Sequence, residues 1–412
     1  MDCSDVAGLV GRMGIGQILY LTRNGLLEPL GQSQIWPYLR GLSSHYRITL
    51  ITFEKPDAYR NPLDIKSMHQ QCNIRGIHWI PLRFHQYPRP WAPAFSIIQL
   101  AALALLQWCR SCPPQLVHVR SYVPAAIALL LNRLTGVSFI FDMRALWPEE
   151  LITAGHLQRG SLLHRLIITL ERSCLKDSSA VVLLTRAAEV YLRDRYPREL
   201  ASQRLAVIPT CADLKRFQLV EPIPSKPIII GCIGTLLSGW FLIDWLRAFF
   251  EAYAQADLTA RFEIISMDPR DSIINALRPS ASLANRLQIR SATPVEMPVI
   301  LQKHSASVMF YSGGSTSELG RSPTRMAEVL GTGRPVVANP GVGDVEQVII
   351  THRVGVLARS SDATEMNSCV AELMVLLEDP NLGNRCRRTA EQLFSLESGI
   401  SAYYKLYSEI LS

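Results

Sequence analysis

Arg325 and Glu328 stand three positions apart in residues 322–344, which read SPTRMAEVLGTGRPVVANPGVGD. Ser322 and Pro323 supply the hydroxyl cap and the first-turn proline that are typical of a helix start. Side chains three apart share one face of a helix, so we expect the guanidinium and the carboxylate to project together. A guanidinium suits phosphate oxygens, and a carboxylate suits a sugar hydroxyl. The pair therefore indicates a site that holds both groups.

A glycine turn follows the same predicted helix. Residues 336–338 form a short apolar run of the kind found in parallel sheets, and Gly341 and Gly343 come soon after it. Their amides would stand open at the carboxyl end of a strand, where α/β folds hold phosphate together with a helix N-terminus. Proline-started helices and glycine-flanked valine runs also occur in α/β proteins without such a site, so the interpretation depends on the rest of the chain.

Charged residues also end two neighbouring predicted strands of the first half. Arg120 follows residues 116–119, while Asp142 and Arg144 follow residues 138–141. Open α/β sheets bind ligands just beyond the carboxyl ends of their strands. We therefore expect these three side chains to converge on one crevice.

The elements that must position these residues alternate between strands and helices. Short apolar runs predict strands, and the amphipathic runs between them predict helices. Such alternation is typical of doubly wound parallel sheets, so the predicted fold class is α/β. The predicted strands cover residues 17–21, 47–52, 77–82, 116–119, 138–141, 180–184 and 205–208, and then 228–233, 262–265, 287–289, 307–311 and 336–338.

Two domains are expected, because 412 residues are long for one core. Three prolines in residues 221–227 (EPIPSKP) indicate a linker. We therefore predict an N-terminal Rossmann-like domain over residues 1–220, a second over residues 228–394 and a final helix within residues 395–412. The first strand-to-helix loop contains Gly31, Gln32, Ser33 and Gln34, a plausible turn toward phosphate or sugar. It is not a G-x-G-x-x-G sequence, which disfavours a dinucleotide site.

Composition narrows the classes of partner. Residues 1–220 hold 25 Lys and Arg against 15 Asp and Glu, and residues 221–412 hold 17 against 20. A basic first half could face anionic lipid or nucleic acid. No nucleic-acid motif accompanies it, so the sequence favours peripheral membrane contact. Residues 83–93 (RFHQYPRPWAP) could cover an acceptor, touch a membrane interface or form an ordinary surface loop.

Cysteines and apolar stretches indicate the compartment. Nine scattered cysteines, an odd number, fit a reducing cytosol better than a disulfide framework, and the lone pair Cys109 and Cys112 lacks a second pair at zinc spacing. We expect no metal site and a cytoplasmic location. The N-terminus shows no signal-peptide pattern. The most apolar stretch, residues 95–108, is too short to span a bilayer, so we expect a core helix there.

Four ordered segments resemble the family 4 glycosyltransferases, which have the GT-B fold. They are residues 18–55, beginning ILYLTRNGLLEPLGQSQ, residues 118–150, beginning HVRSYVPAAIALLLNRL, VIPTCADLKRF at residues 207–217, and residues 322–344. The resemblance implies two Rossmann-like domains facing a central cleft, with a C-terminal helix that crosses back to the first domain. It implies transfer of a sugar from a nucleoside diphosphate-sugar to a hydroxyl, with retention of configuration and without a bound metal.

In the donor domain, this chain has some of the residues that the family places at the donor site and lacks others. Glu328 matches the second of two family glutamates and would bind the nucleotide's ribose, whereas the first falls at Gly320, with Glu318 nearby but off register. The family's cations after the first donor-domain strand are also absent from residues 234–240. We therefore take Arg325 as the candidate replacement and Arg321 as a weaker one. The remaining predicted donor contacts are Gly234, Thr235, Ser322, Thr324, Gly341, Gly343 and Asp344.

The acceptor domain departs from the family as well. Many members have a histidine where this chain has Arg120, and an arginine stays protonated and cannot act as a general base. Arg120 would instead hold an anionic acceptor or phosphate. Asp142 is then the carboxylate nearest to an acceptor hydroxyl, although a departing phosphate oxygen could take the proton itself. Gly31, Gln32, Ser33 and Arg144 are the predicted acceptor or phosphate contacts.

Two other functions remain open at this point. A nucleotide-sugar epimerase can share the architecture, but it would need its own acid and base set. The missing carboxylate at residue 320 and the missing cations after Gly234 also fit a weakly active sugar-nucleotide-binding subunit of a partner enzyme. The leading prediction is a glycosyltransferase acting on a carbohydrate or lipid-linked acceptor, in polysaccharide or glycolipid biosynthesis.

Overall fold

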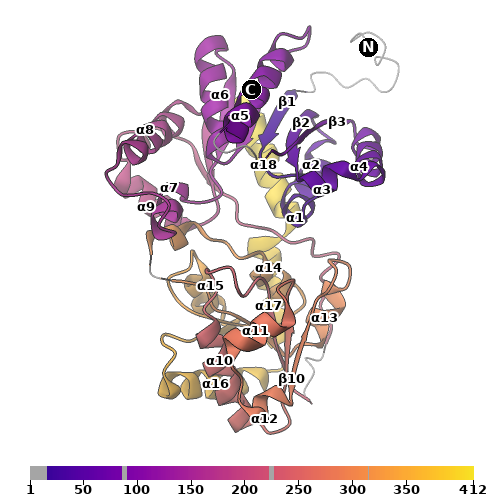
Figure 1. Cartoon of the computed structure of the whole chain (residues 1–412), viewed down its shortest axis with the longest axis vertical. Coiled ribbons are helices and arrows are strands. Elements are labelled where there is room, and N and C mark those ends of the chain that lie inside the picture. Colours follow the sequence, from indigo (N-terminus) through magenta and orange to yellow (C-terminus); the bar gives the residue numbers. More distant parts are fainter. Residues whose placement is uncertain (1–15, 86–90, 222–226, 314) are drawn as a thin grey trace. The chain divides into compact units, whose positions relative to one another are not determined.

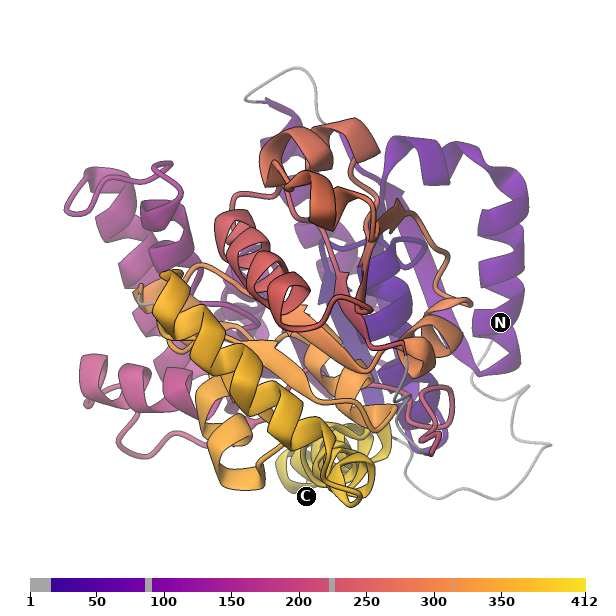
Figure 2. The same ribbon diagram turned by 90° about the horizontal axis from the view of Figure 1, so that it is seen from below.

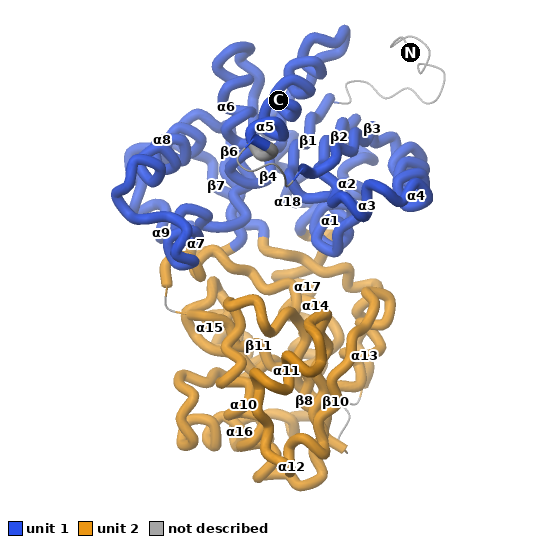
Figure 3. Tube along the Cα trace, in the orientation of Figure 1, with its two compact units in different colours: residues 1–184, 189–208, 399–412 blue, residues 185–188, 209–398 orange. Residues whose placement is uncertain are grey.

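A computed structural model describes residues 16–85, 91–221, 227–313 and 315–412 (Figure 1). The chain forms two compact units (Figure 3). Unit 1 comprises residues 1–184, 189–208 and 399–412, and unit 2 comprises residues 185–188 and 209–398. The chain therefore enters unit 2 at Pro209, earlier than the predicted linker at residues 221–227, most of which lies outside the described residues.

Unit 1 is built on a parallel sheet of seven strands in the order β3-β2-β1-β4-β5-β6-β7. Its inner strands are mostly apolar and buried on both faces, as parallel strands between helices must be, whereas its two edge strands are partly exposed. The strands are β1 (Gln17–Thr22), β2 (Arg47–Glu54), β3 (Ile77–Arg83), β4 (Leu116–Arg120), β5 (Ser138–Asp142), β6 (Ala180–Leu183) and β7 (Leu205–Val207).

The first helical segment of unit 1 consists of two short helices, where the sequence predicts one longer helix. A single helix is expected from residue 32, but the structure begins it at Pro29 and divides it at Ile35, where Pro37 follows. The helices are α1 (Pro29–Gln34), α2 (Trp36–Leu42), α3 (Pro56–Arg60), α4 (Pro62–Ile74), α5 (Trp91–Trp108), α6 (Tyr122–Thr135), α7 (Trp147–Thr153), α8 (Leu162–Asp177) and α9 (Arg186–Arg195).

The C-terminal helix α18 (Leu396–Leu411) packs within unit 1 from residue 399 onward. The Tyr407 hydroxyl lies 2.6 Å from Nδ1 of His118 in β4, and the Tyr46 hydroxyl lies 2.9 Å from the Ser408 hydroxyl. Buried aromatic rings with hydroxyl partners therefore hold this helix against the sheet.

Unit 2 repeats the design with six parallel strands in the order β10-β9-β8-β11-β12-β13. Alternate strand residues enter two different apolar clusters: Ile230 and Cys232 join one, and Ile233 joins the other. This alternation is that of a sheet buried on both faces. The strands are β8 (Ile229–Ile233), β9 (Arg261–Ile265), β10 (Leu287–Arg290), β11 (Ala306–Met309), β12 (Val336–Ala338) and β13 (Gly355–Leu357).

Helices cover both faces of the second sheet. Residues of α10 and α16 share the first cluster and lie side by side (Figures 1 and 2), while those of α14 and α17 share the second. The helices are α10 (Ile243–Ala256), α11 (Arg270–Leu277), α12 (Ala281–Ala284), α13 (Met297–Lys303), α14 (Thr324–Gly331), α15 (Val345–His352), α16 (Ala363–Leu377) and α17 (Leu382–Phe394), with a 3-10 helix at Thr316–Gly320. The prediction of two doubly wound α/β sheets is confirmed.

Candidate active site

The sheet of unit 2 has its topological switch point between β8 and β11, because the strand order runs outward in opposite directions from this pair. Open α/β sheets bind ligands in the crevice outside the carboxyl ends of such strands. Residues 234–240 follow β8, and Phe310 and Tyr311 follow β11. The two segments are joined by hydrogen bonds: the Ser312 amide donates to the Trp240 carbonyl at 3.0 Å, and the Leu242 amide donates to the Phe310 carbonyl at 3.0 Å.

Arg321 lies at this switch point. Its guanidinium carbon stands 5.1 Å from the centre of the Trp240 ring and 5.7 Å from the centre of the Tyr311 ring. Cations over aromatic faces are attracted by the ring electrons. Arg321, the weaker of the two predicted candidate cations, therefore lies beside the loop that follows β8.

Glu318 fixes Arg321 from the opposite side. This carboxylate is fully buried, with Oε2 at 2.5 Å from Nε of Arg321 and Oε1 accepting from its second terminal nitrogen at 3.2 Å. A buried carboxylate needs such a partner, because an unpaired charge in the interior is costly. Glu318, judged off register in the sequence, is thus one half of a buried ion pair.

Arg325 and Glu328 are brought together on one face of α14, as their spacing predicts. The Arg325 guanidinium donates to the Glu328 carboxylate. Burial raises the pKa of Glu328 above its ordinary value, and the neighbouring Arg325 opposes that shift. The guanidinium itself remains about one-third exposed, so it keeps a solvent-facing side that can meet an anion.

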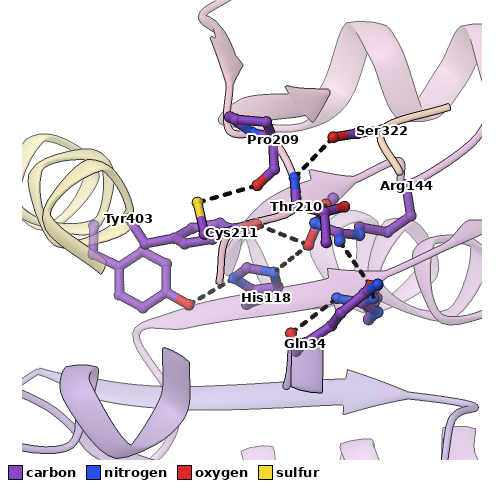
Figure 4. Close-up of polar contacts among 11 residues, drawn as sticks. Gln34, His118, Arg144, Pro209, Thr210, Cys211, Ser322 and Tyr403 are labelled. Carbon is purple, nitrogen blue, oxygen red and sulfur yellow. Dashed lines mark hydrogen bonds and ion pairs between the residues drawn. The ribbon is translucent and has the colours of Figure 1, made fainter. Parts of the chain in front are cut away.

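The start of α14 differs from the prediction. Ser322 does not cap the helix: the capping position is Pro323, which has no hydroxyl, and the helix proper begins at Thr324. The Ser322 hydroxyl instead accepts a hydrogen bond from the Thr210 amide at 3.1 Å (Figure 4). Ser322 therefore ties α14 to the segment at which the chain enters unit 2.

The glycine turn after β12 is less open than predicted. The Gly343 amide already donates to the Glu318 carbonyl at 2.9 Å, so it is not free for phosphate. Gly341 and Gly343 both have positive φ, 82° and 45°, and a Cβ at Gly343 would come within 2.1 Å of the Arg321 carbonyl. These glycines let the turn approach the Glu318–Arg321 segment closely.

Asp344 is also engaged. Its carboxylate accepts from the amides of Arg186 and Ala187 at 2.7 and 2.9 Å. These amides belong to the first turn of α9, in the short stretch of residues 185–188 that is part of unit 2. Carboxylates at a helix N-terminus are stabilised by its unpaired amides, so this side chain acts as a helix cap.

A carboxylate from the loop after β9 binds backbone amides of the loop after β8. The Asp268 carboxylate accepts from the amides of Leu236 and Leu237 at 2.7 and 3.0 Å. Of the predicted contacts in this loop, the Gly234 amide donates to the Ile265 carbonyl at 3.1 Å, and its φ of 152° favours glycine. Thr235 is exposed, which leaves it accessible at the mouth of the crevice.

In unit 1, the predicted charged residues do converge. Arg120 and Arg144 both donate to the Gln34 side-chain oxygen, at 2.6 and 3.1 Å (Figure 4). Arg120 and Asp142 are register partners in β4 and β5, and an Arg144 nitrogen lies 3.7 Å from an Asp142 oxygen. Gln34 is the last residue of the segment that the sequence predicts as a turn toward phosphate or sugar, and its side chain joins this network.

Asp142 is the centre of this network. The Tyr403 hydroxyl donates to its carboxylate at 3.0 Å, and Nε2 of His118 lies 3.4 Å from the same oxygen. Burial alone would raise the pKa of Asp142, but Arg144, His118 and Arg120 outweigh it and hold the pKa at about 2. A carboxylate so stabilised is a poor proton acceptor at neutral pH. These contacts favour a positioning role for Asp142 over the predicted role in assisting the acceptor hydroxyl.

The predicted turn at Gly31, Gln32 and Ser33 is helical. All three residues lie in α1. The side-chain amide of Gln32 donates to the Leu26 carbonyl at 2.7 Å, and the Ser33 hydroxyl donates to the Pro29 carbonyl at 2.8 Å. Gln32 therefore holds the preceding loop in place, and the Ser33 hydroxyl closes a turn of its own helix.

Metal and thiol chemistry have little support in the part of the chain that is described. It contains no group of three or more His, Cys, Asp or Glu residues that could hold a metal ion. Seven of its cysteines are free thiols, including the exposed Cys109. Cys112 is disulfide-bonded, which the sequence did not predict. No helix among the described residues is long and apolar enough to cross a membrane.

Comparison with protein families decides the class. Residues 33–211 match the family model of the glycosyl transferase 4-like domain. Residues 33–211 of this chain are therefore a glycosyl transferase 4-like domain. The matched residues make up most of unit 1, and the two-sheet architecture extends over the rest of the chain. A search of curated protein sequences finds no match.

Solved structures share the fold over the whole glycosyltransferase. Sucrose-phosphate synthase from Thermosynechococcus elongatus is 14% identical with a TM-score of 0.69, covering 96% of this chain and 99% of its own. A glycosyltransferase from Rickettsia africae is 14% identical with a TM-score of 0.68, covering 97% and 99%. Anabaena HepE in complex with UDP and glucose is 14% identical with a TM-score of 0.62, covering 95% and 99%. The fold is therefore GT-B, with two Rossmann-like units.

Proposed function

We propose that this glycosyltransferase moves a sugar from a nucleoside diphosphate-sugar to an acceptor hydroxyl, with retention of anomeric configuration. The observation that carries the proposal is the Arg321 guanidinium at the switch point of unit 2, between the rings of Trp240 and Tyr311. A diphosphate needs positive charge there, because negative charge builds on it as the glycosidic bond breaks. The complexes of Anabaena HepE with UDP and with UDP-glucose support the same class of donor.

The roles in unit 2 follow from this placement. Arg321 and the exposed side of Arg325 would stabilise the leaving diphosphate, and Glu328 would accept hydrogen bonds from the ribose. Thr235 at the mouth of the β8 loop would contact the donor. Because two cations are available, the proposal needs no bound metal ion.

The proton transfer needs no protein base in this proposal. The bond between the anomeric carbon and the phosphate oxygen breaks, the acceptor oxygen bonds to the anomeric carbon on the same face, and the acceptor proton moves to the departing phosphate oxygen. Two observations in unit 1 support this. Arg120 stays protonated, and Asp142, with a pKa held at about 2, is a weak base.

The acceptor is assigned by class only. We propose that unit 1 holds a carbohydrate or lipid-linked acceptor and that the reaction belongs to polysaccharide or glycolipid biosynthesis. Arg120 and Arg144, whose side chains are almost completely buried, carry the positive charge that would attract an anionic group of the acceptor. We also propose a cytoplasmic location. The seven free thiols support it, and the disulfide at Cys112 counts against it.

Release of nucleoside diphosphate tests the proposal. The purified chain is incubated with a panel of nucleoside diphosphate-sugars, with and without EDTA. We expect slow release of nucleoside diphosphate from one donor, unchanged by EDTA. An altered sugar-nucleotide without release would indicate an epimerase, and binding without turnover would indicate a supporting subunit. With an acceptor in hand, proton NMR of the first product gives the anomeric configuration, and inversion would contradict the retaining mechanism.

A further inference from the structure

Helix α5 (Trp91–Trp108) is apolar on its outer face as well as its inner face. It has no charged residue in 18 positions. Ser96, Leu100 and Ala104 are buried toward the rest of unit 1. At about 100° per residue, Trp91, Phe95, Ile98, Leu105 and Leu106 fall within an arc of about 100° on the opposite side, and Ile97, which is 42% exposed, lies outside that arc. The exposed fractions of its large members are Trp91 72%, Phe95 54%, Ile98 66%, Leu105 45% and Leu106 60%.

This arrangement differs from the core helix that the sequence predicts for residues 95–108. An ordinary surface helix has a polar outer face, whereas a helix that is apolar all round is normally buried or in contact with lipid. The next helix, α6, packs against α5 (Figure 1). It also exposes Leu130 and Leu134. Large exposed apolar patches mark interaction surfaces. The outer face of α5 is therefore a candidate interaction surface.

The charged residues that flank α5 in the sequence indicate which class of partner this surface would bind. Between Asp64 and Asp142 the sequence holds no Asp or Glu, while residues 65–141 contain seven Lys and Arg. Arg83 precedes α5 and Arg110 follows it, and both are exposed. In the sequence, one cation stands on each side of this apolar stripe, and the stripe begins with an aromatic residue; both features suit contact with an anionic membrane surface. A second copy of the same face would bring like charges together.

We propose that the outer face of α5 docks this protein onto the surface of an anionic lipid bilayer. Phe95, Ile98 and Leu106 enter the boundary between headgroups and acyl chains, and Arg83 and Arg110 contact anionic headgroups. The helix lies on the bilayer and does not cross it. The docking does not depend on the proposed donor chemistry, because its test measures only the binding of the protein to lipid vesicles.

Vesicle sedimentation of the full chain tests this docking. The probes are vesicles of phosphatidylcholine alone and vesicles enriched in phosphatidylglycerol. We expect wild type to partition at least about tenfold more strongly onto the anionic vesicles, with a loss at high salt. Ile98→Glu with Leu106→Glu should lower that partition by about tenfold or more. Arg83→Ala with Arg110→Ala should lower it and flatten its salt dependence.

Val375→Glu is the matched control, because Val375 is 70% exposed on helix α16 of unit 2. It should bind vesicles as wild type does. Circular dichroism of each variant establishes that it is folded. Equal binding of wild type to both kinds of vesicle, or unchanged binding of the α5 double variant, would overturn the proposal. It would also be overturned if light scattering without vesicles shows a dimer that Ile98→Glu with Leu106→Glu dissociates.

Discussion

The guanidinium of Arg325 donates a hydrogen bond to the carboxylate of Glu328, less than one turn further along α14. Glu328 is buried and its pKa is raised by that burial, with Arg325 opposing the rise. The two residues therefore form one unit: the cation favours the ionised form of the carboxylate, and the carboxylate holds the cation in place on α14. A ligand that binds to one of these two residues is therefore also affected by the other.

Glu328→Ala should weaken binding of the nucleoside diphosphate by about tenfold or more, because charged hydrogen-bond acceptors contribute about 1.5–3 kcal/mol. Arg325→Ala should lower turnover more than binding, since its charge matters most as the diphosphate departs. The double variant should lose less than the sum of the two, because the residues are in contact. Calorimetric titration and initial rates give both quantities.

Arg247→Ala is the control for this pair. Arg247 stands three positions after Asp244 on α10, in an ion pair of 3.7 Å. It has the same spacing and lies in the same unit, but its partner Asp244 is 66% exposed whereas Glu328 is buried, so its removal should leave binding and turnover unchanged. If Arg325→Ala and Glu328→Ala also keep wild-type values, α14 is not part of the donor site.

Arg321→Lys should reduce turnover by about tenfold or more while leaving the fold intact. Lysine keeps the charge but loses the planar group that stacks between Trp240 and Tyr311 and pairs with Glu318. Arg321→Met combined with Glu318→Gln removes the cation without leaving a buried charge unpaired, and it should lose turnover as well.

Arg286→Lys serves as the comparison for Arg321. Its guanidinium stands 5.8 Å from the centre of the Phe262 ring, so it tests the loss of a stacked arginine as such. We expect it to change stability and not turnover per folded molecule. Wild-type turnover in both Arg321 variants would show that the switch-point cation does not act on the donor.

The sequence predicts features that depend on neighbours along the chain. The strands follow from continuous apolar runs, and the pairing of Arg325 with Glu328 follows from helical spacing. The contact of Arg321 with Trp240 does not, because it depends on how two loops distant in sequence meet at one sheet edge. Ser322 shows the same limit: its local sequence predicts a helix cap, but the Thr210 amide takes its hydroxyl instead.

Hydrogen bonds made within the fold explain the other differences between the sequence-based predictions and the structure. Glycines after β12 look like free amide donors in the sequence, yet the Gly343 amide is used by the Glu318 carbonyl. Asp344 looks like a ligand contact, yet it caps the Arg186 and Ala187 amides. Every backbone amide in an interior needs an acceptor, and tertiary structure decides which amides are left for a ligand.

Asp142→Asn should destabilise unit 1 by about 3 kcal/mol at pH 7, because it removes one partner from a buried charged network. The folded-state pKa of about 2 lies below the ordinary value of 3.8. A lowered carboxyl pKa stabilises the fold above about pH 4, and this contribution is lost as the pH falls from about 4 to about 2. Urea unfolding at a series of pH values should show a weaker acid dependence in the variant.

Asp177→Asn provides the reference for Asp142. Asp177 pairs with Arg133 at 2.8 Å, but the Arg133 side chain is 55% exposed. An exposed pair of this kind is worth about 0–1 kcal/mol. Equal unfolding free energies for the two variants would mean that the Asp142 network is not stabilising.

Gly31→Ala should destabilise the protein, against the usual direction for a glycine inside a helix. Alanine there normally adds about 0.5–1 kcal/mol of stability. At Gly31 of α1, however, a Cβ would lie 2.0 Å from the Gly25 carbonyl and 2.8 Å from the Leu26 Cα. Both are backbone atoms, so the loop must shift, and we expect the free energy of unfolding to fall by about 1–3 kcal/mol.

Ser33→Ala, on the exposed side of the same helix, should change the unfolding free energy by less than about 0.5 kcal/mol. Denaturant unfolding of both variants compares them directly, and a more stable Gly31→Ala protein would mean that the loop from Gly25 to Leu26 does not pack on α1.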